Sequence, residues 1–121
     1  DDGIGGIATS GWRGRSLSLG IADSVTVLAQ NAAAADVAAS LIANVITVSS
    51  PAITRQPAVS LVPDSDLKDR LVTVDVGPLS ANEIDQALAA GAGLARQMCD
   101  GGQIMTAYAR LGRRSFVIAS E

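Results

Sequence analysis

Histidine is absent from the sequence, and cysteine occurs once, at Cys99. Without histidine, the chain alone cannot build a histidine-ligated metal site or a Ser-His-Asp catalytic triad. A single cysteine excludes an internal disulfide bond, and an unpaired thiol is typical of a reducing compartment, so we expect a cytoplasmic protein. The apolar periodicity around Cys99 favours a buried small residue over a reactive thiol.

Aromatic residues are also scarce. The chain has one tryptophan, one tyrosine and one phenylalanine among 121 residues, although 48% of its residues are hydrophobic. The core must therefore consist of alanine, valine, leucine and isoleucine, which favours backbones that approach one another closely. A chain of this length is expected to form one domain, residues 1–121, and is too short for a two-domain enzyme.

Runs of basic or apolar residues are missing as well. The net charge is −3 and the arginines are dispersed, which argues against nucleic acid or an anionic membrane as the main partner. No apolar run approaches the roughly 20 residues that a membrane-spanning helix needs. We therefore expect a protein without a nucleic-acid partner and without a membrane partner.

Residues 24–44 form the stretch around which we expect the chain to be organised. Residues 24–29 alternate between the two faces of a strand, in a pattern typical of burial or half-burial. The period then changes, and Asn31 is the expected N-cap of an alanine-rich helix. The expected core-facing stripe of this helix holds apolar residues one turn apart, namely Val37, Leu41 and Val45, beside Ala38 and Ile42.

Asp36, Ser40 and Asn44 form a second stripe directly beside the apolar one. Residues four apart on a helix lie about 6 Å apart on one face, so a carboxylate and a hydroxyl group can share one cation there. The alternative is that these residues only occupy the edge of the helix. The Ser40 hydroxyl would then bond to a backbone carbonyl one turn back.

The rest of the chain alternates between strand patterns and one further helix. Strands are expected within residues 1–11 and over residues 16–21, 71–76, 103–111 and 115–120, with strand fragments and loop over residues 46–63. Ser80 and Glu83 form a capping box that opens a helix reaching about Asp100, where Gly101 and Gly102 end it. Gly91 inside this helix predicts close packing on a sheet. We expect an α+β domain, with two helices packed on one face of a mixed, mostly antiparallel sheet.

Three segments carry a resemblance to a known family. They are the turn Ile7-Ala8-Thr9-Ser10-Gly11, the strand over residues 23–29, and the helical segment Ala-Asp-Val-Ala-Ala-Ser over residues 35–40. In this order and spacing they resemble the second half of the ApbE-like superfamily, whose best-known members are magnesium-dependent enzymes that use FAD to place FMN on a protein threonine. Residues 12–16 and 64–76 are most similar to a branch of that superfamily with no assigned activity.

The resemblance implies a cofactor site and a metal site. Thr9, Ser10 and Gly11 would form the turn beside the flavin, FAD or FMN, or beside another diphosphate-bearing nucleotide. Asp36 and Ser40 would bind Mg²⁺, which prefers oxygen ligands and usually shares them with phosphate oxygens. An active enzyme of this kind would be a magnesium-dependent transferase or a nucleotide pyrophosphatase, with the metal stabilising the leaving group.

Two features of the sequence keep another interpretation open. The flavin transferases carry a histidine-containing loop where this chain has residues 15–21, which contain no histidine. The alternative is therefore a non-catalytic binding or assembly subunit, or a partner in another metabolic step such as sulfur-linked amino-acid synthesis. The resemblance also covers only the C-terminal half of such proteins. We expect that half to need a missing N-terminal half as a second chain, or a homo-oligomer, to cover sheet edges and apolar surface.

Overall fold

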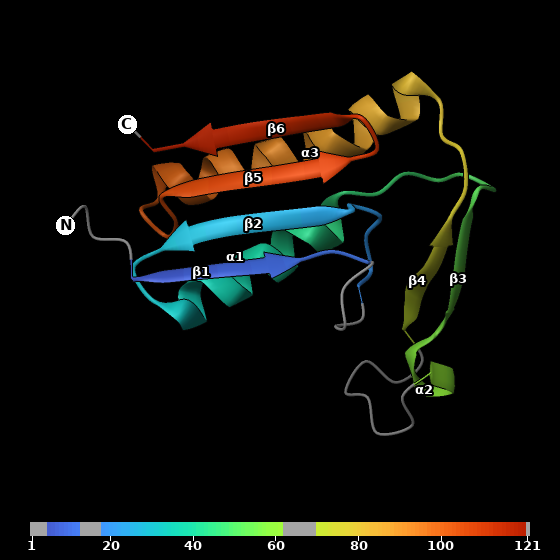
Figure 1. The fold of residues 1–121 in the computed structure, drawn as a ribbon, viewed down its shortest axis with the longest axis horizontal. Helices are drawn as coiled ribbons and strands as arrows, with labels where there is room; N and C mark the ends of the chain where they lie inside the picture. The colour runs from blue at the N-terminus through green and yellow to red at the C-terminus, as the bar shows by residue number, and fades with distance from the viewer. Residues whose placement is uncertain (1–4, 13–17, 62–69, 121) are drawn as a thin grey trace.

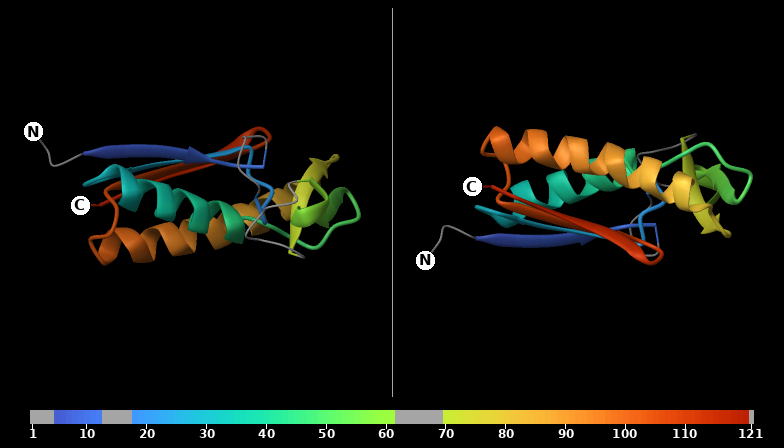
Figure 2. Two further views of the ribbon diagram at one scale, coloured as in Figure 1. Left: turned by 90° about the horizontal axis from the view of Figure 1, so that it is seen from below. Right: turned by 90° about the horizontal axis from the view of Figure 1, so that it is seen from above.

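The computed structural model describes residues 5–12, 18–61 and 70–120. Four strands form the main sheet in the order β1-β2-β5-β6, with bounds β1 Gly6–Ser10, β2 Ser24–Ala29, β5 Thr106–Leu111 and β6 Arg114–Ala119. All three neighbouring pairs of this sheet are antiparallel. Two long helices, α1 (Ala32–Val45) and α3 (Ala81–Asp100), cover one face of it (Figure 2). The expected α+β class with two helices on one face is confirmed.

A second, smaller sheet lies at one end of the main layer (Figure 1). It consists of β3 (Ile53–Pro57) and β4 (Leu71–Val76), which are also antiparallel, and the single-turn helix α2 (Ala58–Leu61) follows β3. We expected one mixed sheet. Among the described residues the strands instead divide between two sheets, and every pairing is antiparallel. Residues 62–69 lie outside the described part, so of the segment 64–76 that carries part of the resemblance the structure describes only residues 70–76.

Helices α1 and α3 begin where their local sequences predict. The Asn31 side chain caps the first turn by accepting a hydrogen bond from the Ala34 N–H at 2.8 Å. Helix α3 begins with the expected capping box, in which the Ser80 oxygen accepts from the Glu83 N–H and the Glu83 carboxylate accepts from the Ser80 N–H. These bonds satisfy backbone donors that a helix start leaves unpaired.

The core-facing stripe of α1 was only partly predicted. Ala38 and Ile42 are buried as expected, but Val37, Leu41 and Val45 are 59%, 47% and 38% exposed. The buried side consists instead of small residues with one isoleucine: Ala35, Ala38, Ala39, Ile42 and Ala43. Alanine faces the sheet because the start of α1 lies directly against the backbone of β1, where a side chain at Gly6 would collide with residues 31 and 32. The larger residues are therefore displaced to the flank of the helix.

The strand predicted over residues 16–21 is wrong for residues 18–21, the part that the structure describes. These residues bond to elements other than a sheet. The Leu19 N–H donates to Asn44 Oδ1 at 3.1 Å, and the Ile21 N–H donates to the Ile46 carbonyl at 2.8 Å. The Ser18 carbonyl accepts from the Thr73 N–H at 2.9 Å. Residues 18–22 therefore join the end of α1 to β4. Their alternating side chains do not reflect a strand, because these backbone bonds go to Asn44, Ile46 and Thr73.

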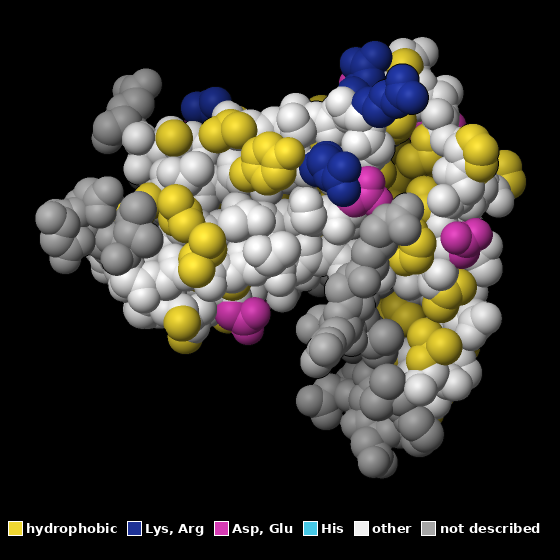
Figure 3. Space-filling view, in the orientation of Figure 1, with side chains coloured by type: hydrophobic (Ala, Val, Ile, Leu, Met, Phe, Trp, Pro, Cys, Tyr) yellow, Lys and Arg dark blue, Asp and Glu magenta, His cyan; other side chains and the backbone are white. Residues whose placement is uncertain are grey.

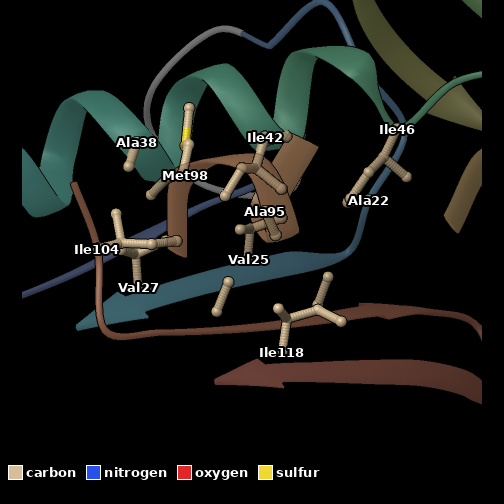
Figure 4. Packing of buried hydrophobic residues seen from close by; sticks show 14 of the residues in the cluster. Ala22, Val25, Val27, Ala38, Ile42, Ile46, Ala95, Met98, Ile104 and Ile118 are labelled. Atoms are coloured by element: carbon tan, nitrogen blue, oxygen red, sulfur yellow. The ribbon is translucent and has the colours of Figure 1, made fainter. Parts of the chain in front are cut away.

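The core fills the space between the main sheet and the two helices. Figure 4 shows Ile42 and Ile46 from the α1 side, Ala95 and Met98 from α3, and Val25 and Val27 from β2 meeting in one cluster. Helix α3 buries the side that holds Gly91, Ala95 and Met98, as expected from the close packing predicted at Gly91. Because the side chains are small, backbone contacts set the distance between the layers.

Gly91 tests this close packing. A β-carbon at Gly91 would overlap the side chain of Ile46, whereas a β-carbon at Gly93, two residues further along the same helix, would meet no atom within 4 Å. Gly91→Ala should destabilise the protein by about 1–3 kcal/mol through overpacking, despite the better helix propensity of alanine. Gly93→Ala is the matched control and should stabilise it by about 0.5–1 kcal/mol. Urea unfolding measures both; equal effects of the two substitutions would contradict the packing described.

Candidate functional site

The turn Thr9-Ser10-Gly11 closes β1, the edge strand of the main sheet. Gly11 is buried with a φ of 150°, and a β-carbon there would press against the carbonyls of Asp23 and Ala22. Any other residue would strain the backbone at this point. The backbone conformation of the turn therefore explains Gly11 without reference to a flavin.

Thr9 and Ser10 point to opposite faces of β1. Ala8 packs against the core, so Ser10, two residues on, lies on the helix-covered side, and Thr9 lies on the outer face. On that outer face the Thr9 and Thr26 hydroxyl oxygens are 3.0 Å apart and hydrogen-bonded. Thr26 is in turn paired with Tyr108, and Tyr108 with Val117, which makes one cross-strand row.

No helix of the described residues covers the outer face of the main sheet (Figure 2). Tyr108 is 37% exposed, and Ile7 and Val117 are 65% and 63% exposed on the same face. Figure 3 shows apolar side chains spread across this face, in the orientation of Figure 1. A flat, partly apolar surface with hydroxyl groups and one tyrosine ring can accept a planar aromatic ligand by stacking. The sequence alone does not reveal the row, because it depends on the strand register.

Asp36 and Ser40 lie on the flank of α1 that faces away from α3. The opposite flank, with Val37 and Leu41, lines the groove between the two helices. At 100° per residue, Asp36, Ser40 and Asn44 follow the other flank, beside β1. Asp36 is exposed, while Ser40 and Asn44 are half-buried. Neither Asp36 nor Ser40 makes a side-chain hydrogen bond to another residue of the described part, so the alternative in which Ser40 bonds to a backbone carbonyl is not seen there.

The structure brings the two predicted groups to one pair of elements but not into one pocket. β1 and α1 are packed together and run in the same direction (Figure 1), with Gly6 of β1 against the start of α1. Ser10 is on the same side of β1 as Asp36 and Ser40. Thr9 is separated from them by the thickness of the edge strand.

The donor set offered to a metal is small. Within the described ranges no three residues among histidine, cysteine, aspartate and glutamate lie close enough to hold an ion. Asp36 and Ser40 supply one carboxylate and one hydroxyl. This is compatible with Mg²⁺, which commonly takes one or two protein carboxylates and completes its octahedron with phosphate oxygens and water. The pair fits a metal that arrives with a phosphate ligand and does not form a closed protein cage.

Cys99 is a packing residue. Its side chain is 7% exposed, and its thiol lies 3.8 Å from the Met105 carbonyl. Burial, with a smaller contribution from Asp100, raises the pKa of the Cys99 thiol. A raised pKa lowers the thiolate fraction at neutral pH, so the thiol is a poor nucleophile. The prediction of a buried small residue is confirmed.

A groove of about 450 Å³ runs between α1 and α3. It is lined by alanines and larger apolar residues with one amide: Ala33, Ala34, Val37, Ala38, Leu41, Met98 and Gln103. The exposed side chains of Val37 and Leu41 form one wall of this groove. An exposed apolar groove of this kind is typical of a surface that binds another polypeptide.

Arg55 was missed by reasoning from the sequence. It lies on β3, half-buried, with its guanidinium group against Leu19, Thr47 and Thr73. Burial lowers its pKa. The only signal in the sequence is a basic residue within a strand fragment, and the three partners are 36, 8 and 18 residues away along the chain.

Comparison with known proteins identifies the family of the chain. The model of a family described as AbpE bacteria matches residues 1–117, nearly the whole chain. No curated protein and no solved structure matches. In addition, none of the helices in the described ranges has the length and apolar character needed to cross a bilayer.

Proposed function

The chain belongs to the AbpE bacteria family, and from this premise and the geometry of β1 and α1 we propose that it binds Mg²⁺ together with a flavin or another diphosphate-bearing nucleotide. The observation that carries the proposal is the pair of the exposed Asp36 and the half-buried Ser40, one helical turn apart and without side-chain hydrogen bonds in the described part of the chain. The stripe lies beside the edge strand that ends in Thr9, Ser10 and Gly11.

The ligand would lie across the free edge of β1. Its diphosphate, with the metal, would face Asp36 and Ser40 on the helix side, with the Ser10 hydroxyl nearby. Its aromatic ring would lie on the outer face, where Thr9 and Tyr108 belong to one cross-strand row. The metal would neutralise charge on the phosphates and so stabilise the leaving group of a transfer or hydrolysis. The likeness of the sequence to ApbE-like proteins supports the same assignment.

Asp36 gives the sharpest test of this proposal. In titration calorimetry of FAD in the presence of Mg²⁺, carried out on the chain with any polypeptide that copurifies with it, Asp36→Asn should weaken binding by about tenfold or more, because it removes the one carboxylate of the metal site. Asp100→Asn, at an exposed position on α3, changes the net charge equally and should leave binding unchanged. No binding heat for the parent, or equal affinities for the parent and Asp36→Asn, would refute the proposal.

A second candidate function is that of an assembly subunit, favoured by the groove between α1 and α3. Its walls are apolar, and the side chains of Val37 and Leu41 are exposed. Exposed apolar grooves of this kind usually mark sites of protein–protein interaction. The occupant would be a second polypeptide that supplies the remainder of an ApbE-like protein, or another copy of this chain.

Substitution in the groove tests the assembly function. Leu41→Asp should dissociate the assembly, because a carboxylate would be buried against apolar groups. Val117→Asp, on the outer face of the sheet and 63% exposed, is the control and should leave the assembly intact. Light scattering coupled to size exclusion measures both masses. A monomeric parent, or an assembly that Leu41→Asp leaves whole, would exclude the groove as the interface.

A further inference from the structure

Arg55 holds three segments together at the end of α1. Its Nη1 donates to the Leu19 carbonyl at 2.6 Å and to Thr73 Oγ1 at 3.4 Å, and its Nη2 donates to Thr47 Oγ1 at 2.7 Å. The register of β3 against β4 shifts between Thr54 and Arg55. Such an irregularity redirects a side chain out of the normal alternation.

The positive charge of Arg55 is not neutralised by the described protein. All of the partners of Arg55 in the described ranges are neutral, and none of the carboxylates in those ranges contacts it. A guanidinium group carries five N–H donors, and the Nε–H and one Nη2 hydrogen of Arg55 have no acceptor in the described part of the chain. A half-buried charge without a counter-ion is costly, and the bare donors are the place where a counter-ion would bind.

The hydroxyl groups around Arg55 differ in what they leave available. Thr73 is buried, and its hydroxyl donates its only hydrogen to the Gly20 carbonyl at 2.6 Å and accepts from Arg55. Thr47 is half-buried and only accepts from Arg55, so its hydroxyl hydrogen is available to a ligand. The vacant N–H groups of Arg55 and the hydroxyl hydrogen of Thr47 can therefore all donate hydrogen bonds to a ligand at this point. Several donors beside a positive charge favour an anion with several acceptor oxygens.

We propose that Arg55 and Thr47 form an oxyanion subsite that binds a phosphate group. Arginine with a hydroxyl group is well suited to phosphate, because the planar guanidinium can offer two parallel N–H bonds while the hydroxyl bonds a third oxygen. The positive charge of Arg55 disfavours a metal or a cationic ligand at this point, and no carboxylate of the described residues contacts it.

The subsite lies where the polar stripe of α1 ends. The backbone of Leu19 connects the subsite to the stripe, because the Leu19 N–H donates to Asn44 Oδ1 and the Leu19 carbonyl accepts from Arg55. Asn44 is the third residue of the stripe, about 12 Å along the helix axis from Asp36. The subsite deepens the proposed function and rests on it for the identity of the natural ligand, a nucleotide with more than one phosphate. Its test does not need a flavin or a metal.

The competing explanation is a purely structural role, in which Arg55 only fastens the β3–β4 sheet to residues 18–22. The two explanations differ in their response to phosphate. If Arg55 is only structural, phosphate and chloride at the same ionic strength should have the same effect on the protein. An anion subsite gives a saturable, phosphate-dependent change at Arg55 itself.

The experiment is a titration of the ¹⁵N-labelled chain with inorganic phosphate and with pyrophosphate, at constant ionic strength maintained with chloride. The Nε–H signal of Arg55 and the amide signal of Thr47 should shift and saturate in the parent. Arg55→Gln should abolish the saturable shift at Thr47, and Thr47→Val, which keeps the arginine, should weaken phosphate binding by about threefold or more. Arg110→Gln, at an exposed position on β5, is the matched control for the loss of one positive charge.

Each outcome decides the question. A saturable shift in the parent that Arg55→Gln and Thr47→Val reduce, and that Arg110→Gln keeps, supports the subsite. If Arg55→Gln does not fold, the parent Nε–H signal and Thr47→Val decide alone. A linear, non-saturating shift, or an equal response of Arg110→Gln and Thr47→Val, overturns it. Phosphate binding here without FAD binding would retain the subsite and refute the flavin, and the reverse result would refute only the subsite.

Discussion

The close backbone contact at the C-terminal end of α1 is the constraint on which the other parts of the structure depend. Ile46, just after the helix, is fully buried and fills the space that Gly91 leaves on α3. Its carbonyl accepts from the Ile21 N–H, and Gly20 lies directly against the carbonyl of Ala43. Any side chain at Gly20 or Gly91 would push these elements apart. The scarcity of large side chains in the core makes this contact possible.

The same contact places the candidate functional groups. Residues 18–22 are bonded to the end of α1, and the Ser18 carbonyl accepts a hydrogen bond from the Thr73 N–H of β4. Residues 18–22 therefore attach the small sheet to α1. Arg55 crosses this junction from β3 to Leu19 and Thr47. On the flank of α1 that faces the edge strand β1, the helix presents Asp36 and Ser40. The proposed metal ligands Asp36 and Ser40 and the proposed phosphate subsite are thus both positioned by α1, although they come from different segments.

Local signals made much of this fold predictable. The caps at Asn31 and Ser80 and the glycine stop after Asp100 act over three or four residues, so they can be read from the sequence directly. The strands β2, β4 and β6 alternate clearly, and their positions are confirmed; β5 begins at Thr106, three residues later than expected. The α+β class follows from these elements and their order.

Features that depend on distant partners were not predictable in the same way. Residues 18–21 alternate like a strand, but their hydrogen bonds go to Asn44, Ile46 and Thr73. Val37, Leu41 and Val45 have the period of a buried stripe, yet the sheet accepts the alanine side because only small residues fit its backbone. Asp36 and Ser40 could be named as a pair because they are four residues apart on one helix. Arg55 could not, because its three partners are assembled only by the tertiary fold.

Native-state hydrogen exchange at the Ile21 amide tests the central constraint most directly. If the contact between residues 20–21 and the end of α1 is part of the cooperative core, this amide should exchange only through global unfolding, as slowly as the protected amides of β2 and β5. The Thr73 amide, bonded to Ser18, should behave in the same way. Exchange of Ile21 at the rate of an unprotected loop amide, while β2 stays protected, would show that the junction opens independently and would contradict the account.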